Sequence, residues 1–346
     1  MLYIRADGNA QIGAGHIMRC LSIAQAAREQ GRECTFITAD EQMKPLLEEQ
    51  GFSVICLNSV WNDLERETEQ MEELIHKESI QTLLIDSYFA TPKYLERLHR
   101  STHVACMDDL HDFVRSCSTV INYNLYSTGL SYTNDYPEGV RLLLGAKYTP
   151  LRKEFQNLPQ RITGKECRDV LVTTGGSDPL NIAGRLVERA KQRTGTADMT
   201  YHVVAGRFNP HLAMLEELAQ KYPGVVIHRN VQKMSERMLS CDLAISASGS
   251  TLYELSACGT PTICFAWADN QLGGVEAFGK GYMHSVGDIR VNFEKTLDEI
   301  LDGVVQLATQ PKERQRQASG LQTLVDGKGA ARLAQALWSA CDKTIK

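Results

Sequence analysis

The chain has 346 residues, of which 43% are hydrophobic and 23% are charged, and its formal net charge is −5. This length exceeds the roughly 100–200 residues of one ordinary domain, so we expect two domains. The weak negative charge gives no support to a large basic surface of the kind that binds nucleic acid. A phosphate group would therefore have to be bound locally, by backbone amides and helix ends.

The ten cysteines are scattered through the sequence and form no CxxC pair. Most lie inside apolar runs, where cysteine behaves as a small hydrophobic residue. This pattern predicts neither a zinc site nor a disulfide framework, and it is typical of a reducing cytosol. The N-terminus lacks a signal-peptide pattern, and no apolar run approaches the roughly 20 residues that span a bilayer. We therefore expect a cytoplasmic protein without a membrane span.

Strand-like and helix-like segments alternate from the start of the chain. The strand-like segments of the first half are 2–6, 33–39, 52–58, 82–88 and 103–109, and its helix-like segments are 16–31, 41–51, 62–80 and 91–100. The strands are nearly continuous apolar runs, which is typical of parallel strands covered on both faces. Helices between such strands predict right-handed βαβ units.

A polar stretch at 156–168 interrupts this alternation, which then restarts. The later strand-like segments are 169–176, 199–206, 224–230, 242–248 and 261–267, and the helix-like segments are 182–193, 211–222 and 329–343. We predict an α/β fold with two similar doubly wound halves. The expected boundaries are a first domain at 1–156, a second domain at 157–328, and a C-terminal helical segment at 329–346.

The loop GNAQIGAGHIMR (8–19) joins the first strand to the first helix. It places Gly8, Gly13 and Gly15 just before His16, but it is neither a GxGxxG fingerprint nor a Walker A loop. Free N–H groups at a helix start favour anions and disfavour imidazolium, so His16 should be neutral and able to accept a proton. From these residues alone, His16 is equally well a catalytic base, a helix cap or a core-edge residue.

Two later strand-to-helix turns are also rich in glycine and hydroxyl groups: TTGGSDPLN (173–181) and SASGSTLYELSACGTP (246–261). The residues that could offer amides or hydroxyls to a diphosphate are Thr174, Gly175, Gly176, Ser177, Ser248, Gly249, Ser250 and Thr251. Ser177 and Asp178 are candidate helix caps. Glu254 follows the second turn and could accept hydrogen bonds from a ribose diol, or it could lie on a solvated helix face.

The opening run RADGNAQIGAGHIMRCLSIAQA resembles the UDP-2,4-diacetamido-2,4,6-trideoxy-β-L-altropyranose hydrolases of pseudaminic acid biosynthesis. Further matching runs are LLIDSY (83–88), MDDL (107–110), INYNL (121–125), LLLGAKYTPLRKEF (142–155), SASGSTLYELSACGTPTICF (246–265) and ADNQ (268–271). The matches in the second half also resemble the wider group of GT-B glycosyltransferases, including the lipid II-forming N-acetylglucosaminyltransferase. The resemblance extends from residue 1 to residue 271.

This resemblance implies a GT-B fold, with two Rossmann-like domains facing across a cleft and the C-terminal helix packing back on the first. It implies hydrolysis of the UDP-sugar to UDP and 2,4-diacetamido-2,4,6-trideoxy-L-altrose, by water and without a metal or other cofactor. His16 matches the family's proposed base, and Tyr88 matches a tyrosine near the reacting centre. The residues of the two later turns and Glu254 are expected to bind the substrate. Five further residues are expected to do so as well: Gly13, Gly15, Arg19, Asn270 and Gln271.

Several alternatives remain at this point. Tyr88 could simply pack at a strand end, and Asn270 and Gln271 could stabilise their loop. Asp108 and Asp109 could suggest a metal site, but acidic pairs at strand ends are more often turn or capping residues. The competing functions are a GT-B glycosyltransferase that uses a UDP-sugar, and a binding protein without activity. The expected partner is a small-molecule UDP-sugar, with no nucleic acid, and a monomer is favoured.

Overall fold

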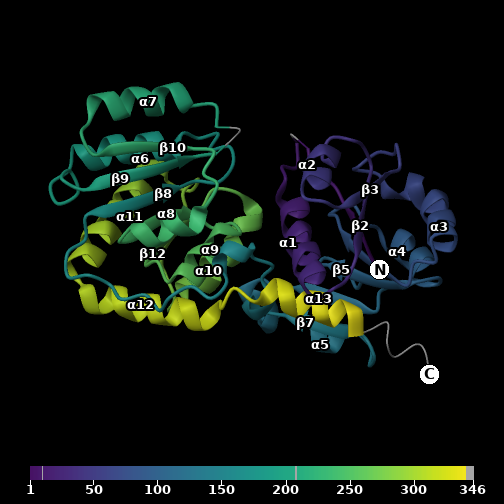
Figure 1. Cartoon of the computed structure of the whole chain (residues 1–346). Coiled ribbons are helices and arrows are strands. Elements are labelled where there is room, and N and C mark those ends of the chain that lie inside the picture. Colours follow the sequence, from purple (N-terminus) through teal and green to yellow (C-terminus); the bar gives the residue numbers. More distant parts are fainter. Residues whose placement is uncertain (10, 207–208, 340–346) are drawn as a thin grey trace. The chain divides into compact units, whose positions relative to one another are not determined.

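The computed structural model describes residues 1–9, 11–206 and 209–339, and the chain divides into two compact units (Figure 1). Unit 1 consists of Met1–Lys153 together with Gly327–Lys346, and unit 2 consists of Glu154–Asp326. The last positions of the predicted C-terminal helix, 340–343, lie outside the described residues. Each unit is an α/β structure with its own sheet.

Within the described residues, unit 1 is built around a seven-stranded sheet in the order β3-β2-β1-β4-β5-β6-β7, with every neighbouring pair parallel. Its strands are β1 (Leu2–Ala6), β2 (Cys34–Thr38), β3 (Ser53–Cys56), β4 (Thr82–Asp86), β5 (His103–Met107), β6 (Thr119–Asn122) and β7 (Arg141–Leu144). Its helices are α1 (Gly15–Glu29), α2 (Lys44–Glu49), α3 (Thr68–Lys77), α4 (Pro92–His99), α5 (Tyr132–Asp135) and α13 (Gly329–Ser339). The strand order reverses direction at β1 and β4, which is the doubly wound arrangement.

Unit 2 repeats this arrangement with six described strands in the order β10-β9-β8-β11-β12-β13, again all parallel. Its strands are β8 (Asp169–Thr173), β9 (Thr200–Ala205), β10 (Val225–Arg229), β11 (Leu243–Ala247), β12 (Thr262–Ala266) and β13 (His284–Asp288). Its helices are α6 (Ile182–Lys191), α7 (Leu212–Lys221), α8 (Met234–Ser240), α9 (Thr251–Cys258), α10 (Leu272–Gly279), α11 (Phe293–Thr309) and α12 (Pro311–Leu324). The predicted fold class, two doubly wound α/β halves, is confirmed.

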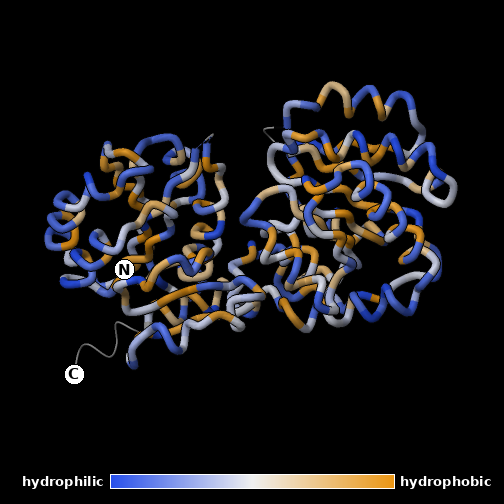
Figure 2. Tube along the Cα trace, turned by 180° about the vertical axis from the view of Figure 1, so that it is seen from behind, coloured by the Kyte–Doolittle hydropathy of each residue, from blue (hydrophilic) through white to orange (hydrophobic). Residues whose placement is uncertain are grey.

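Buried apolar residues of the strands lie in the core of each unit, and the hydropathy colouring shows hydrophobic stretches running through both units (Figure 2). Every residue of β1, β4, β11 and β12 is buried, which explains why their sequences are not alternating but almost continuously apolar. The predicted helix at 62–80 is divided into a 3-10 helix at Leu64–Glu67 and α3. Strands β6 and β7 were not among the predicted elements.

Helix α13 follows α12 of unit 2 but packs within unit 1 against α1. The Gln30 side chain donates to the Ala331 carbonyl at 3.0 Å, and Arg141 donates to the Ala336 carbonyl at 2.6 Å. Gly329 lies so close to the backbone of Thr149 that an added Cβ would be 2.1 Å from its oxygen. The chain therefore contributes its final described helix to the unit with which it begins.

Candidate active site

Polar side chains gather at the carboxyl ends of neighbouring strands in unit 1. His16 lies in the first turn of α1, just after the loop that follows β1, and Asp86 is the last residue of β4. Asp109 and Tyr123 follow β5 and β6. Because parallel strands end at one edge of the sheet, these side chains from four separate segments meet there. This edge, at the point where the strand order reverses, is where open α/β sheets bind ligands.

The loop before His16 is organised by Asn9, which the sequence analysis did not single out. Its Oδ1 accepts hydrogen bonds from the N–H groups of Gln11 at 2.8 Å and Ile12 at 3.0 Å, and its own N–H donates to the Gly13 carbonyl at 3.1 Å. Gly13 has φ 72°, a left-handed conformation that favours glycine. An added Cβ at Gly13 or Gly15 would meet no atom of residues 1–9, 11–206 or 209–339 within 4 Å, so these described residues leave space beside both glycines.

The imidazole of His16 is directed at Asp86. Its Nδ1 lies 3.2 Å from the Asp86 carbonyl oxygen and 3.3 Å from the carboxylate Oδ1. A carbonyl oxygen can only accept, so this contact is a hydrogen bond only when Nδ1 carries the proton. In the neutral ring, Nε2 then has the free lone pair and can accept a proton. The contact therefore favours the neutral tautomer that carries its proton on Nδ1 and leaves Nε2 unprotonated.

Arg19 holds Asp86 in its ionised form. The Arg19 Nε donates to Asp86 Oδ2 at 2.6 Å, and the carboxylate side chain is only 1% exposed. Burial by itself would raise the pKa of Asp86, but the charges of Arg19 and His16 and the hydrogen bonds from Arg19 outweigh it and lower the pKa to about 2. Asp86 is therefore a carboxylate at any pH at which the protein would work.

Asp109 is the second carboxylate that Arg19 contacts. Arg19 Nη1 donates to Asp109 Oδ2 at 2.7 Å and also to the Tyr123 hydroxyl at 3.0 Å. The Tyr88 hydroxyl donates to the same Asp109 oxygen at 3.0 Å, while its ring meets the His16 ring edge-on with centroids 4.6 Å apart. Burial and the charge of Asp109 raise the pKa of Tyr88 above its ordinary value, so its phenol stays protonated. Tyr88 remains 43% exposed.

The adjacent Asp108 belongs to a different network. It is fully buried, its carboxylate lies 3.0 Å from Arg115, and it accepts hydrogen bonds from the Tyr132 hydroxyl and the His111 N–H, both at 2.9 Å. The two aspartates that follow one another in the sequence thus serve separate sets of partners. Across residues 1–9, 11–206 and 209–339, no group of three His, Cys, Asp or Glu side chains is arranged to hold a metal ion.

The two glycine-rich turns of unit 2 differ at their helix starts. At the TTGGSD turn, Asp178 is fully buried and its carboxylate accepts hydrogen bonds from Ile182 N at 2.8 Å and Ala183 N at 3.0 Å. Of the two candidate caps, Asp178 fills this role for α6. Its negative charge occupies the place that an anion would take at this helix end.

Within the described part of the chain, the SASGST turn has no such carboxylate, and no side chain caps α9. Ser248 is buried, and its Oγ has no hydrogen-bond partner among the residues that the structure describes. An added Cβ at Gly274, in α10, would lie 2.6 Å from this oxygen, so glycine is needed to leave Ser248 its room. The start of α9 is therefore the better anion site of the two.

The remaining predicted binding residues lie on or near α9 and α10. Glu254 is half-buried in the first turn of α9, one turn from Thr251. Asn270 is exposed in the 3-10 helix Asp269–Gln271. Gln271 accepts a hydrogen bond from Trp267 N at 2.9 Å through Oε1, which is the contact expected of the loop-stabilising alternative. Its amide nitrogen is the part that a substrate could use.

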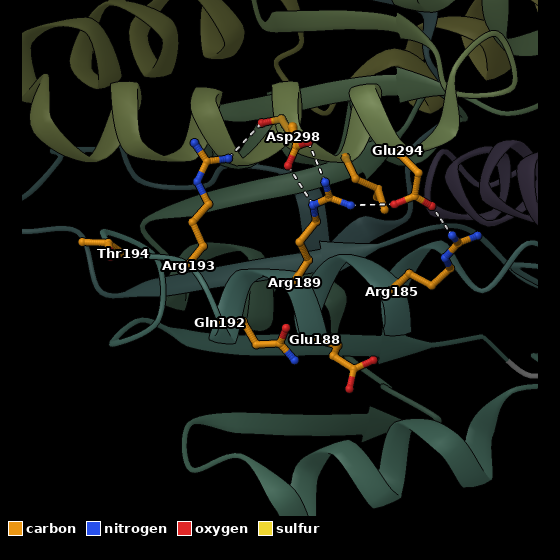
Figure 3. Close-up of a pocket in the computed structure, with 9 residues that line it drawn as sticks. Arg185, Glu188, Arg189, Gln192, Arg193, Thr194, Glu294 and Asp298 are labelled. Carbon is orange, nitrogen blue, oxygen red and sulfur yellow. Dashed lines mark hydrogen bonds and ion pairs between the residues drawn. The ribbon is translucent and has the colours of Figure 1, made fainter.

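A groove of about 980 Å³ lies along α6 and α11 (Figure 3). Its lining includes Arg185, Arg189 and Arg193, which follow one another at four-residue spacing, and the acids Glu294 and Asp298. Together with Asp302, which Arg193 contacts, these side chains form what we call the arginine ladder. Every arginine is already paired with a carboxylate, so the groove offers no free charge to an anion. We interpret it as a contact that joins two helices.

No protein-family model matches the chain. The spore coat polysaccharide biosynthesis protein SpsG of Bacillus subtilis is 25% identical over 349 residues, which cover 99% of each chain. The UDP-2,4-diacetamido-2,4,6-trideoxy-β-L-altropyranose hydrolase of Campylobacter jejuni is 24% identical over 249 residues, 70% of this chain and 84% of the hydrolase. An uncharacterized protein of Methanocaldococcus jannaschii is 27% identical over 272 residues, and the chain spans only 54% of its length.

Solved structures match over nearly the whole chain. MurG of Acinetobacter baumannii has a TM-score of 0.71 at 12% identity and covers 98% of this chain and 99% of its own. The protein has the GT-B fold. The GT-B likeness extends to a UDP-GlcNAc 2-epimerase of Neisseria meningitidis bound to UDP-GlcNAc, with a TM-score of 0.67 at 12% identity, covering 98% of this chain and 100% of the epimerase. No helix of the described GT-B chain is both long and apolar enough to cross a membrane.

Proposed function

We propose that this protein is an enzyme that hydrolyses a UDP-sugar, and that the sugar is the 2,4-diacetamido-2,4,6-trideoxy-L-altrose named in its Campylobacter jejuni homologue. The observation that carries the proposal is the contact of His16 Nδ1 with Asp86. It leaves Nε2 as a proton acceptor at the sheet edge where ligands bind. The open space beside Gly13 and Gly15 gives water and a sugar room to approach.

In the proposed reaction, a water molecule attacks the anomeric carbon of the sugar and passes a proton to Nε2 of His16. The oxygen of this water forms the new bond to the anomeric carbon. The bond between that carbon and the diphosphate oxygen breaks, and its electron pair leaves with UDP. Because UDP is a good leaving group, the harder task is to activate water, which is the task of a base. Asp86 stabilises the imidazolium that forms, as the aspartate of a catalytic triad does.

Unit 2 is proposed to bind UDP. The start of α9, with no side-chain cap and with Ser248 Oγ unpaired, supports a diphosphate there, where amides and the helix dipole meet its negative charge. Thr174, Gly175, Gly176 and Ser177 are proposed to contribute from the other turn. Ser250, Gly249 and Thr251 complete the α9 turn, and Glu254 is proposed to accept hydrogen bonds from the ribose. Asn270 and the amide of Gln271 are proposed to contact the sugar.

The direct test incubates the pure protein with the UDP-linked diacetamido sugar in EDTA, without an acceptor, and follows UDP and free sugar by NMR. We expect stoichiometric release of both products. Absence of turnover under these conditions, with sugar transfer once an acceptor is supplied, would reject the hydrolase. UDP binding is tested separately by calorimetry, in which Gly274→Ala and Glu254→Ala should each weaken affinity. Unchanged affinity in both would reject the α9 site.

The second candidate is a GT-B glycosyltransferase that passes a sugar from UDP to an acceptor other than water. The observation that favours it is the fold shared with MurG. The two functions use the same proposed UDP site and differ in what reaches the anomeric carbon. The NMR experiment above distinguishes them, because only the hydrolase releases free sugar when water is the sole acceptor.

A further inference from the structure

The Arg19 side chain joins two carboxylates from neighbouring strands of unit 1. It lies one helical turn after His16 on α1. Its Nε contacts Asp86 at 2.6 Å and its Nη1 contacts Asp109 at 2.7 Å, so different edges of one planar guanidinium hold different carboxylates. The three side chains are largely removed from water, with 12%, 1% and 12% of Arg19, Asp86 and Asp109 exposed. Such a fork fixes geometry better than a lysine could.

Each carboxylate also contacts one of two further side chains: His16, the proposed base, and Tyr88, which the family resemblance expects near the reacting centre. Asp86 faces Nδ1 of His16, and Asp109 accepts the hydrogen bond of the Tyr88 hydroxyl. The rings of His16 and Tyr88 then meet edge-on at 4.6 Å. These contacts close into a cycle, which we call the Arg19 cycle: His16, Asp86, Arg19, Asp109, Tyr88 and back to His16. Each member is held from two sides.

The charges of the Arg19 cycle suit the proposed proton transfer. Two carboxylates face one guanidinium, so the cycle carries one net negative charge while His16 is neutral. The proton that His16 would take from water makes the cycle neutral. In a largely buried cluster this is more favourable than creating a net positive charge, because charge interactions are less screened there than in water.

We propose that Arg19 and Asp109 are positioning residues, which act through Asp86 and Tyr88 to hold the His16 imidazole in one tautomer and one orientation. This inference rests on the proposed function, in which His16 is the base. It gives Arg19 a different role from the direct substrate contact expected from its sequence motif, because its guanidinium is already engaged by two carboxylates and the Tyr123 hydroxyl.

The first experiment needs no substrate. Protein labelled with ¹⁵N-histidine is examined by NMR, with His16→Gln to assign the His16 signals. In the wild type we expect separate ring-nitrogen shifts typical of the tautomer protonated at Nδ1. In the variants Arg19→Lys, Asp109→Asn and Tyr88→Phe, the two ring-nitrogen shifts should move toward each other, as expected when the imidazole exchanges between its two neutral tautomers. Tyr88→Phe removes only a hydroxyl from a side chain that is 43% exposed, so it tests the cycle without threatening the fold.

The matched control is Arg189→Lys in the arginine ladder, which disrupts an equally bidentate arginine–carboxylate pair in unit 2. It should leave the His16 signals and the rate unchanged. In the hydrolysis assay, Asp109→Asn and Arg19→Lys should lower kcat on the order of 10²-fold and change KM little, as expected when a reacting group is misplaced.

The outcomes separate this inference from the function on which it rests. If the wild type does not hydrolyse the sugar but the three variants shift the His16 signals, the proposed function fails and the positioning role stands. If the wild type is active and the His16 signals are the same in all three variants, the positioning role is overturned. A loss of kcat in Arg189→Lys equal to that in Arg19→Lys would also overturn it.

Discussion

Two arginine–carboxylate networks in this molecule use the same chemical groups in different surroundings. In the Arg19 cycle of unit 1, the Asp86 side chain is 1% exposed and touches an imidazole. In the arginine ladder of unit 2, Arg189 is bidentate to Asp298, but the two side chains are 35% and 46% exposed. The bonds have similar lengths. The difference in burial and in neighbours indicates that only the first network can tune a reacting group, while the second connects α6 with α11.

The largest expected effect comes from replacing the base itself. His16→Gln keeps a polar side chain of similar size but cannot take the proton from water, so kcat should fall about 10²- to 10⁴-fold, the usual range for loss of a general base. Initial rates at saturating UDP-sugar measure this, with Arg189→Gln as the control expected to keep wild-type activity. A His16→Gln enzyme within a few-fold of the wild type would return His16 to a structural role.

The second effect is on stability. Asp86→Asn removes one of the two carboxylates that pair with the buried guanidinium of Arg19. Because a buried charge then loses a partner, the free energy of unfolding should fall by roughly 3–5 kcal/mol. Asp298→Asn in the exposed ladder should cost about 0.2–1 kcal/mol. Urea denaturation, followed by tryptophan fluorescence, measures both free energies. The Asp86→Asn comparison is made in a Trp267→Phe background, so that the remaining tryptophans, Trp61 and Trp338, report on unit 1. Equal losses would mean that burial does not distinguish the two networks.

The third prediction concerns acid. Burial alone would raise the pKa of Asp86, but Arg19 and His16 lower it to about 2 in the folded protein, against about 4 in an unfolded chain. Because folding lowers this pKa, the ionised Asp86 stabilises the folded protein fully above about pH 4, and this stabilisation is lost as the pH falls toward 2. The wild type should therefore lose about 2 kcal/mol more than Asp86→Asn between pH 5 and pH 2. Urea denaturation at each pH measures the free energy of unfolding of both proteins. If wild type and Asp86→Asn lose the same amount between pH 5 and pH 2, the lowered pKa of Asp86 is contradicted.

The sequence predicted those features that depend on neighbouring residues. Apolar runs such as 82–86 identified parallel strands, and the glycines before His16 correctly predicted a turn that leads into a helix. Asp178 was correctly included among the candidate caps, because a helix cap acts within five residues of its own position. Helices α11 and α12 were not among the predicted elements, although α11 is strongly amphipathic.

The sequence could not predict which side chains converge. Asp86 and Asp109 lie 67 and 90 residues from Arg19, and they meet it only because β4 and β5 adjoin one another beside β1 in the sheet. Asp108 and Asp109 look like a single acidic pair in the sequence. Their side chains leave the backbone in different directions, so that Asp108 pairs with Arg115 and Asp109 with Arg19. The one sequence feature that could have identified Asp86 as a site residue is its position as an acidic residue at the end of an apolar strand.

The smallest expected effect tests the arginine ladder. Arg189→Gln removes the pairing with Glu294 and Asp298, and these exposed pairs should contribute no more than about 1 kcal/mol because water and salt screen them. At 1 M NaCl the screening length shrinks to about 3 Å, so the difference in unfolding free energy between wild type and variant should nearly vanish. The corresponding difference for Asp86→Asn should persist at 1 M NaCl, because a buried pair is screened much less. Urea denaturation of the two variants at 0.05 M and 1 M NaCl measures both differences. A ladder contribution that resists salt would place the two networks in one class.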